Sequence, residues 1–375
     1  MKNKIFNEFA SSQNTFFRNY ANILPNPDTI LQKSGKQISA YNNLKNDAHV
    51  WSCIQSRKSG SINSELTIQP NGASERSSLL LEQFLNNLDL EQIYRDILEA
   101  ILFGYQPMEI YWKQSGEYII PERIVAKPQD WFYFDLLGQI KYKSILEKKD
   151  ELPPNYKIIC PQHEASFNNP YGVALLSKCY WAVQFKSGSM RFWVTLAEKY
   201  GMPLLLGKYT RGATFEEAEK LANSLMELAQ DAVIVTPSDI EIALHEPNRT
   251  SSVELFKELI NLCNAEISKA ILSQTLTTEM SGGSYAATSV HQEIRREIIA
   301  SDIRLIESTI NQVVKYIYEI NFPREIFYPK VKLLADDLDY SQKLERDIRL
   351  TKDAGLKLNQ NYWIKNYGYK AGDFE

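Results

Sequence analysis

The longest regular pattern in this sequence is an apolar repeat at helical spacing that runs from about residue 286 to residue 320. Apolar side chains recur three or four positions apart, which is the period of one face of an α-helix. They are Val290, Ile294, Ile298, Leu305, Val313 and Ile317. At about 1.5 Å per residue, such a helix is roughly 50 Å long, which is long for a globular core. The pattern predicts one helix that crosses a whole domain, with polar residues such as Arg295 and Asp302 on its other faces.

Two further helical patterns precede this helix and enclose a short mixed segment. The helical patterns lie at 173–200 and within 246–272, and the segment between them is 201–245. The segment alternates strand-like and helical stretches, and Thr214 and Glu217 have the spacing of a capping box at the start of its helix. We therefore expect a small α/β unit inserted between two long helices.

The first half of the chain predicts a separate α+β region. Residues 1–46 are rich in asparagine and weakly patterned, as expected of an arm or a peripheral cap. Within 47–172, helical spacing at 49–60 and 75–103 is followed by apolar and aromatic clusters at 108–142. Glycine and proline separate these clusters, which is typical of an antiparallel meander. The whole pattern indicates the α+β fold class.

Composition and charge exclude several classes of protein. The chain has 375 residues, is 44% hydrophobic and 23% charged, and carries a formal net charge of −4 with both signs mixed along its length. A protein that binds nucleic acid tightly is usually basic on one face, so this mixed and slightly acidic charge argues against such a protein. No window approaches the run of about eighteen apolar residues that a membrane span needs, so no membrane partner is expected. The four cysteines are far apart in sequence and predict ordinary reduced thiols.

A search for chemistry finds no catalytic, metal or cofactor motif. The four histidines are more than forty residues apart and form no HExxH pair. Gly282 and Gly283 lack the GxxxxGK[ST] context of a phosphate loop, and Ser189 lies within a helical pattern rather than at a nucleophile elbow. The sequence therefore predicts no enzyme and no cofactor.

One acidic cluster leaves an alternative open. Asp336, Asp337 and Asp339 could hold a divalent cation, as in a metal-dependent nuclease. The simpler interpretation is that these acids stabilise the amino end of the helical segment that follows. We favour the second interpretation.

A set of aromatic side chains in the first of the two long helices also has two interpretations. Trp181, Phe185, Phe192 and Trp193 could stack on nucleic-acid bases. At this spacing within an apolar helix, core or subunit packing is the expected use.

Residues 273–289, SQTLTTEMSGGSYAATS, separate the second long helix from the longest one. The segment contains one charged side chain and neither lysine nor arginine. Its central residues are Thr275, Thr277, Thr278, Glu279, Ser281, Gly282, Gly283 and Ser284. From composition alone, this is an ordinary helix–helix linker as readily as a functional loop.

Six segments of the chain resemble a known family in their order and spacing. They are HVWSCIQSRKSG (49–60), FGYQPMEIYW (103–112), NNPYGVALLSKCYW (168–181), RFWVTLAEKYGMPLLLGKY (191–209), LCNAEISKAILSQTLTTEMSGGSYAA (262–287) and HQEIRREI (291–298). In these segments the chain resembles the portal proteins of Mu-like tailed bacteriophages and prophages. The resemblance spans about 49–300, which is most of the chain.

The resemblance implies the portal fold, with an α/β wing, a two-helix stem, a small clip between the stem helices, and a tunnel loop before a long wing helix. The implied boundaries are an N-terminal arm at 1–46, a wing at 47–172, stem helices at 173–200 and 246–272, a clip at 201–245, a tunnel loop at 273–289, a long wing helix with a following strand at 290–335, and a short helical C-terminal segment at 336–375.

The resemblance further implies a ring, usually a dodecamer, at one vertex of the phage head. Double-stranded DNA passes through the ring during packaging and ejection. The implied partners are the terminase large subunit, the major capsid or scaffold protein and head-completion proteins, and the implied locations are the virion and, during assembly, the host cytoplasm. The tunnel-loop residues Thr275 to Ser284 named above would face DNA, and Phe185, Trp193 and Phe256 would lie in subunit contacts.

The chain departs from the family at its C-terminal end. Family members generally continue well past the final YKAGDFE, so the resemblance implies that a crown or tail-end domain is absent or truncated here. A prophage remnant that acts only as a structural or interaction protein is the alternative function.

Overall fold

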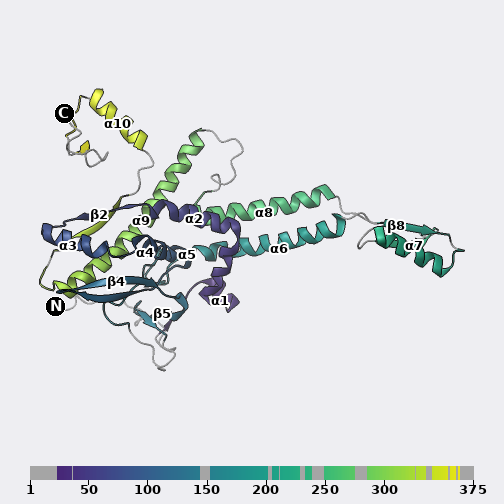
Figure 1. Ribbon diagram of the computed structural model, residues 1–375, viewed down its shortest axis with the longest axis horizontal. Helices are drawn as coiled ribbons and strands as arrows, with labels where there is room; N and C mark the ends of the chain where they lie inside the picture. The colour runs from purple at the N-terminus through teal and green to yellow at the C-terminus, as the bar shows by residue number, and fades with distance from the viewer. Residues whose placement is uncertain are drawn as a thin grey trace.

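The structure is a computed structural model. It describes residues 23–35, 37–143, 153–201, 205–210, 212–228, 233–238, 249–274, 285–325, 327–334, 340–353, 355–359 and 362–363. Figure 1 shows an α/β body from which two long helices, α6 (Leu175–Gly201) and α8 (Arg249–Leu272), extend side by side toward a small α/β unit at the far end. The mixed α+β class predicted from the sequence is confirmed.

Helix α9 (Tyr285–Asn321) crosses the body, as predicted. Its buried face agrees with the predicted stripe only in part: Val313 and Ile317 are buried, whereas Ile294, Ile298 and Leu305 are only partly buried. The fully buried positions are Ile299, Ile303, Ile306, Ile310, Val313, Val314 and Ile317. The body covers α9 from more than one side, so the apolar face is wider than a single stripe. Its neighbours include β10 (Lys330–Leu334), β4 (Tyr118–Ala126) and α2 (Ala48–Ile62).

Asp302 corrects the prediction for the polar faces of this helix. The sequence places it on a solvated face, whereas the structure buries its carboxylate to 2% exposure. Arg57 supplies the opposite charge, which allows an acid to lie among the apolar residues of α9.

Three small sheets form the strand part of the body. The predicted strands are confirmed as β3 (Met108–Ser115), β4 (Tyr118–Ala126), β5 (Phe132–Asp135) and β6 (Ile140–Tyr142). They do not form one meander: β3 pairs antiparallel with β4 and β5 with β6, and the two hairpins belong to separate sheets. Strand β7 (Ile158–Ile159) adds to the free edge of β3.

A second pairing joins distant parts of the chain. Strand β2 (Glu65–Gln69) pairs antiparallel with β10, across more than 260 positions of sequence. Because β2 directly follows α2 (Ala48–Ile62), this pairing holds the end of α2 next to β10, the strand that follows α9.

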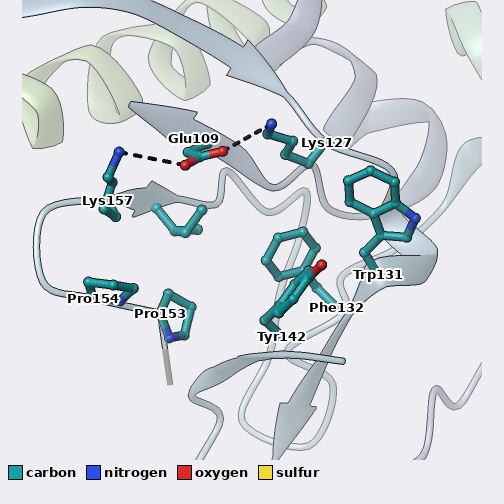
Figure 2. Close-up of a pocket in the computed structure, with 9 residues that line it drawn as sticks. Glu109, Lys127, Trp131, Phe132, Tyr142, Pro153, Pro154 and Lys157 are labelled. Carbon is teal, nitrogen blue, oxygen red and sulfur yellow. Dashed lines mark ion pairs between the residues drawn. The ribbon is translucent and has the colours of Figure 1, made fainter. Parts of the chain in front are cut away.

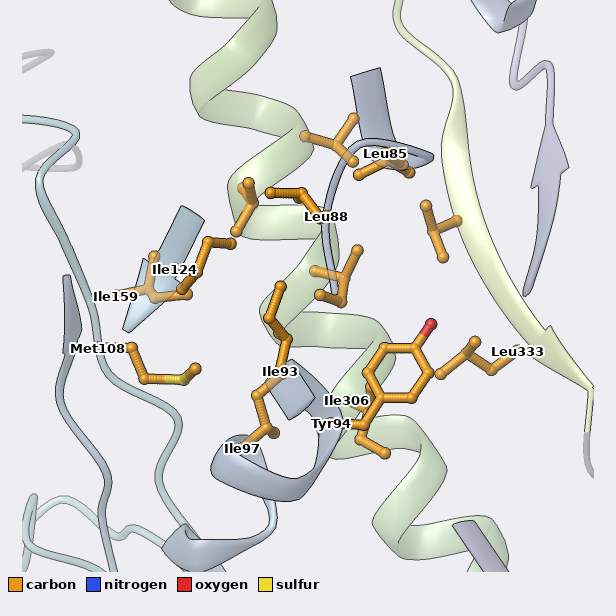
Figure 3. Packing of buried hydrophobic residues seen from close by; sticks show 14 of the residues in the cluster. Leu85, Leu88, Ile93, Tyr94, Ile97, Met108, Ile124, Ile159, Ile306 and Leu333 are labelled. Carbon is orange, nitrogen blue, oxygen red and sulfur yellow. The ribbon is translucent and has the colours of Figure 1, made fainter. Parts of the chain in front are cut away.

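The helices of the body are shorter than the sequence pattern predicts. Helix α2 (Ala48–Ile62) agrees with the pattern, but the run at 75–103 forms three helices, α3 (Glu75–Leu85), α4 (Leu90–Ile97) and α5 (Glu99–Phe103). Asp89 causes the first break, because its carboxylate accepts a hydrogen bond from the Gln92 amide and caps α4. A core of isoleucine, leucine and valine from α3, α4, α9 and the β3–β4 hairpin fills the space between these elements (Figure 3).

The described residues before α2, from Ile23 onward, are part of the body. They form β1 (Ile23–Leu24), which pairs with β5, then α1 (Thr29–Ser34) and a 3₁₀ helix, η3 (Ile38–Asn46). Tyr41 and Leu44 of η3 are buried in a second core that includes residues of α2, α6 and α8. The Tyr41 hydroxyl donates a hydrogen bond of 2.8 Å to Asp28 Oδ1, so the hydroxyl is satisfied.

The small unit at the far end of α6 and α8 is a βαβ element. Strands β8 (Leu205–Tyr209) and β9 (Val233–Pro237) pair in parallel, and α7 (Phe215–Leu228) connects them. The predicted capping box is confirmed: the Thr214 amide donates to Glu217 Oε2 at 2.9 Å, and the Glu217 amide donates to Thr214 Oγ1 at 3.4 Å. The end of the predicted unit, from residue 239 to residue 245, lies outside the described residues.

Two glycines meet backbone to backbone at the junction of the β3–β7 sheet and α6. Gly104 and Gly172 have φ angles of 92° and 70°, and a Cβ on Gly172 would lie 2.4 Å from the carbonyl oxygens of both Gly104 and His163. No side chain fits at either position. The contact fixes the turn at 163–173, which leads from β7 into α6.

Candidate functional site

Helices α6 and α8 form a hairpin with one buried and one exposed apolar face. Val183 of α6 is buried, and Trp181 and Phe185 lie two residues to either side of it. At about 100° per residue, these two aromatic residues point to the opposite side of the helix. Phe185 is 56% exposed, and its ring stacks on that of Trp181 with centroids 5.8 Å apart.

Further large apolar side chains are exposed along both helices: Met190, Phe192 and Val194 on α6, and Leu255, Leu259 and Leu262 on α8. At about 100° per residue, Phe192 lies on the same side of α6 as Trp181 and Phe185, whereas Met190 and Val194 lie nearer the side of Val183. We call this set, with Trp181 and Phe185, the apolar stripe. Monomeric proteins rarely expose so many large apolar side chains on one pair of helices, and such surfaces usually mark interaction sites.

The other two predicted contact residues lie against each other within the hairpin. The rings of Trp193 on α6 and Phe256 on α8 are stacked, with centroids 6.5 Å apart and an interplanar angle of 14°. Both side chains are partly buried. Their first structural role is therefore to hold the far half of α6 against α8.

Buried polar contacts fasten the near half of the hairpin to α2. Lys186 of α6 forms an ion pair of 2.8 Å with Asp47, and both side chains are nearly buried. Asp47 also caps α2, because its carboxylate accepts hydrogen bonds from the amides of His49 and Val50. On α8, Ser268 Oγ lies 2.7 Å from His49 Nε2.

The charge of Asp47 is stabilised in place. Burial raises the pKa of its carboxyl group, but the hydrogen bond from Lys186 and those from the backbone amides of Val50 and His49 outweigh burial. The net pKa of Asp47 therefore lies below its ordinary value. The ionised carboxylate is the form that joins α2 to α6.

Arg57 connects three helices at the end of α8. Its Nε and Nη2 atoms donate to the two carboxylate oxygens of Asp302 on α9, each at 2.8 Å, and its Nη1 donates to the carbonyl oxygen of Ile271 at 2.8 Å. Ile271 lies in the last turn of α8, where carbonyl groups lack a partner within the helix. The side chain of Arg57 on α2 therefore clamps α8 and α9, the two helices that residues 273–284 connect.

The sequence offers a signal for this clamp that the periodicity analysis missed. Arg57 follows Val50 and Ile54 on the buried face of α2, and Asp302 lies between Ile299 and Ile306 on the buried face of α9. Opposite charges on two apolar faces indicate a buried pair, since an unpaired buried charge is costly.

A pocket of about 280 Å³ lies on the body, away from the hairpin (Figure 2). We call it the aromatic pocket. It is lined by Glu109, Lys127, Trp131, Phe132, Tyr142, Pro153, Pro154, Lys157 and Ile158. Most of its lining surface is apolar, and the sequence analysis did not identify it.

Charged side chains lie on one side of the aromatic pocket. Glu109 is 2.9 Å from Lys127 Nζ and 3.6 Å from Lys157 Nζ. Burial raises the pKa of Glu109, but hydrogen bonds from Lys127 and Tyr111 lower it by more, so its net pKa is depressed. One carboxylate thus faces two ammonium groups, which leaves the rim with an excess positive charge.

The predicted DNA-facing residues and the acidic cluster lie outside the described residues. These are Thr275, Thr277, Thr278, Glu279, Ser281, Gly282, Gly283 and Ser284 in the first set, and Asp336, Asp337 and Asp339 in the second. Among the described residues, no group of three or more histidine, cysteine or acidic side chains is arranged to hold a metal ion. No helix in the described part of the chain is both long and apolar enough to cross a membrane.

Two solved structures share this arrangement of elements. A chain of the "Virion of native gene transfer agent (GTA) particle" has a TM-score of 0.58, with 12% sequence identity over 90% of this chain and 98% of that chain. A chain of the "Neck of empty GTA particle computed with C6 symmetry" has a TM-score of 0.59, with 12% identity over 91% of this chain and 94% of that chain. At this identity the likeness concerns the fold.

Two curated proteins are similar in sequence. The Mu-like prophage FluMu protein gp29 of Haemophilus influenzae is 27% identical over 290 residues, which cover 73% of this chain and 55% of that protein. The portal protein of Escherichia phage Mu is 26% identical over 326 residues, which cover 84% of this chain and 60% of that protein. This chain thus matches a little more than half of the length of each relative.

The family described as "Portal protein of Mu bacteriophage" matches residues 38–369. The match includes the hairpin, the far unit, the Arg57 clamp and the body with its aromatic pocket. The chain therefore belongs to the family of the Mu bacteriophage portal protein.

Proposed function

We propose that this chain assembles into a ring at the vertex of a phage head, and that double-stranded DNA passes through the ring during packaging and ejection. The observation that carries the proposal is the family match over residues 38–369. The fold likeness to chains of a gene transfer agent virion and neck supports it. Twelve subunits are the proposed number, and the virion the proposed location.

The parts of a portal follow the chain in order. In our proposal the N-terminal arm is 1–46, the wing is 47–172, the stem is 173–200 and 246–272, the clip is 201–245, the tunnel loop is 273–289, the long wing helix and its strand are 290–335, and 336–375 is a short helical C-terminal segment. The hairpin of α6 and α8 and the β8–α7–β9 unit agree in order and size with a stem and a clip.

The apolar stripe is the proposed contact between neighbouring stems. A contact in which one face of a subunit meets a different face of the next is heterologous, and such contacts close into rings. Phe185, exposed beside Trp181, is at the centre of this contact. Trp193 and Phe256 would add to this contact through the parts of their stacked rings that stay exposed.

The tunnel loop would touch DNA without holding it. Each lysine or arginine that neutralises a phosphate releases counterions and adds salt-dependent affinity, and a ring repeats that gain in every subunit. Residues 273–289 carry no such cation, and their serine and threonine hydroxyls offer weak, exchangeable hydrogen bonds. Gly282 and Gly283 would let the backbone move as the groove of DNA passes.

The clip is the proposed docking site for the terminase large subunit and, later, for head-completion proteins. Capsid or scaffold proteins would contact the wing. The chain contains no GxxxxGK[ST] motif, so the terminase would supply the energy for packaging.

Negative-stain microscopy of the purified protein, alone and with capsid or scaffold protein, tests the proposal. We expect rings with a central hole. Single particles without a hole under every assembly condition would contradict it.

A further inference from the structure

We propose that Phe167 of one copy of this chain inserts into the aromatic pocket of a neighbouring copy, and that this contact joins the bodies of adjacent subunits. The inference rests on the ring proposed above, but it concerns a different surface from the stem. Two independent features carry it: a rigid turn that exposes a phenylalanine, and a pocket that fits one.

Phe167 is 100% exposed. It lies at the tip of the turn at 163–173, where the amide of Ser166 donates to the carbonyl of Asn169 at 3.2 Å and the amide of Asn169 donates back at 3.1 Å. Ser166 Oγ also donates to Asn168 Oδ1 at 2.8 Å. These bonds hold the tip in one conformation, so the ring is presented with little entropy left to lose on binding.

The base of the turn is equally well fixed. His163 and Val173 face each other, with the Val173 amide donating to the His163 carbonyl and His163 Nδ1 lying 2.8 Å from the Val173 carbonyl. The His163 amide donates to the carbonyl of Gly104, and the Gly104–Gly172 contact closes the base. A turn anchored in this way does not fold back to bury its phenylalanine.

The aromatic pocket has the size and surface for a phenyl ring. A cavity of about 150 Å³ with apolar walls is enough to hold benzene, and this pocket measures about 280 Å³. Phe132 and Tyr142 form one wall, with ring centroids 5.5 Å apart. Trp131 stands exposed at the rim, where it can meet an incoming ring edge to face (Figure 2).

The charges of the two surfaces are complementary. Lys127 and Lys157 lie on one side of the pocket, with Glu109 as the single acid between them. Glu164 belongs to the same turn as Phe167 and is exposed. A neighbouring copy therefore brings a carboxylate together with its phenylalanine, and the lysines of the pocket can pair with it.

A second copy of this chain is the occupant that these features favour. Each copy carries both halves of the contact, so it offers Phe167 to one neighbour and its pocket to the other. Head-to-tail pairing of this kind is what a closed ring requires.

A disulfide between two different copies tests the contact directly. We would co-express two copies with different tags, one carrying Phe167→Cys and the other Trp131→Cys, and isolate doubly tagged disulfide-linked species after mild oxidation. The matched control replaces Trp131→Cys by Leu137→Cys, which lies on an exposed turn and does not line the pocket. We expect the link with Trp131→Cys and none with Leu137→Cys.

Phe167→Ala is the second test. Because the side chain is fully exposed, the variant keeps the melting temperature of the parent protein, whereas loss of a buried phenyl ring weakens self-association on the order of 10- to 100-fold. Phe167→Leu should recover most of the loss. Unchanged association of Phe167→Ala, or equal disulfide yields at positions 131 and 137, would overturn the contact.

The outcomes distinguish this contact from the ring. Rings in microscopy without the disulfide would contradict the contact and leave the proposed function standing. A linked dimer in the absence of any ring would support the contact and contradict the proposed function. Neither rings nor a link would contradict both.

Discussion

The guanidinium of Arg57 and the carboxylate of Asp302 form two parallel hydrogen bonds of 2.8 Å, in a site where both side chains are almost completely buried. Arg57→Ala leaves the Asp302 carboxylate without its partner. Removing one member of a buried pair costs about 3–5 kcal/mol, and we expect a loss of this size in the free energy of unfolding, measured by urea denaturation.

An exposed ion pair of the same body is the control. Arg95 and Glu91 are 2.6 Å apart on α4, with side chains 43% and 64% exposed. Pairs of this kind contribute about 0.2–1 kcal/mol, so Arg95→Ala should change stability little. Equal losses in the two variants would contradict the role assigned to Arg57.

Gly60 lets α2 and α9 approach each other closely. A Cβ at this position would lie 2.4 Å from Ile299 Cδ1, which is closer than two carbon atoms can pack. Gly60→Ala should therefore lower the free energy of unfolding by about 1–3 kcal/mol. The double variant with Ile299→Val, which shortens the opposing side chain, should recover part of the loss.

Gly188 of α6 provides the opposite case. A Cβ added there meets no atom within 4 Å, and alanine is favoured over glycine in a helix by roughly 1 kcal/mol. Gly188→Ala should be neutral or stabilising. A thermal shift in the same direction for both glycine variants would show that packing against Ile299 is not the cause.

Asp47→Asn tests the link between α2 and the hairpin. Asparagine keeps the helix cap but removes the charge opposite Lys186, and we expect a loss of about 2–3 kcal/mol at pH 7. Because the pKa of Asp47 is lowered on folding, its stabilising effect is complete above its unfolded pKa of about 4 and is lost as the pH falls through the folded value.

The pH dependence is the distinguishing measurement. The difference in unfolding free energy between the parent protein and Asp47→Asn should be constant from pH 7 to about pH 5 and should shrink below about pH 4. A difference that stays the same down to pH 2.5 would mean that the charge of Asp47 is not what stabilises the contact.

Phe185→Ser with Trp181→Ser tests the apolar stripe. Both side chains are exposed in the single chain, so the fold should keep its melting temperature, while ring assembly should be lost because a buried aromatic side chain contributes about 1.5–3 kcal/mol per contact. Light scattering and microscopy measure the assembly. The control is Leu356→Ala, an exposed apolar residue outside the hairpin; the same loss there would argue against a specific stripe.

Ser281→Lys with Ser284→Lys tests the uncharged tunnel loop. Two added cations per subunit should slow DNA translocation, and the slowing should diminish as the salt concentration rises, because phosphate contacts are salt-dependent. The same positions changed to glutamine supply the uncharged control. Undisturbed packaging and ejection by the lysine variant would count against the proposed role of the loop.

The features predicted correctly from the sequence are those fixed by neighbours along the chain. The α9 helix has a periodic pattern of its own, and the Thr214–Glu217 capping box needs only four consecutive residues. The strands of the two hairpins within 108–142 are bounded by glycine or proline at each turn. Local chemistry decides all three.

The features that were missed depend on partners far away in sequence. Asp302 is buried because Arg57, 245 positions earlier, supplies its counter-charge. The aromatic pocket is lined by residues of β3, the end of β4, the β5–β6 hairpin, and β7 with the segment before it. No local sequence pattern predicts that these segments lie together. Trp193 and Phe256 were expected at a subunit contact, and their stacking across two helices is likewise a tertiary property.

Helix α8 is a single uninterrupted rod between the β8–α7–β9 unit and the Arg57 clamp, with a length of about 36 Å for its 24 residues. A helix is stiff along its axis, so an axial displacement of Arg249, at its far end, would move the Ile271 carbonyl by a similar distance. The hydrogen bond from Arg57 Nη1 to that carbonyl would oppose such a displacement.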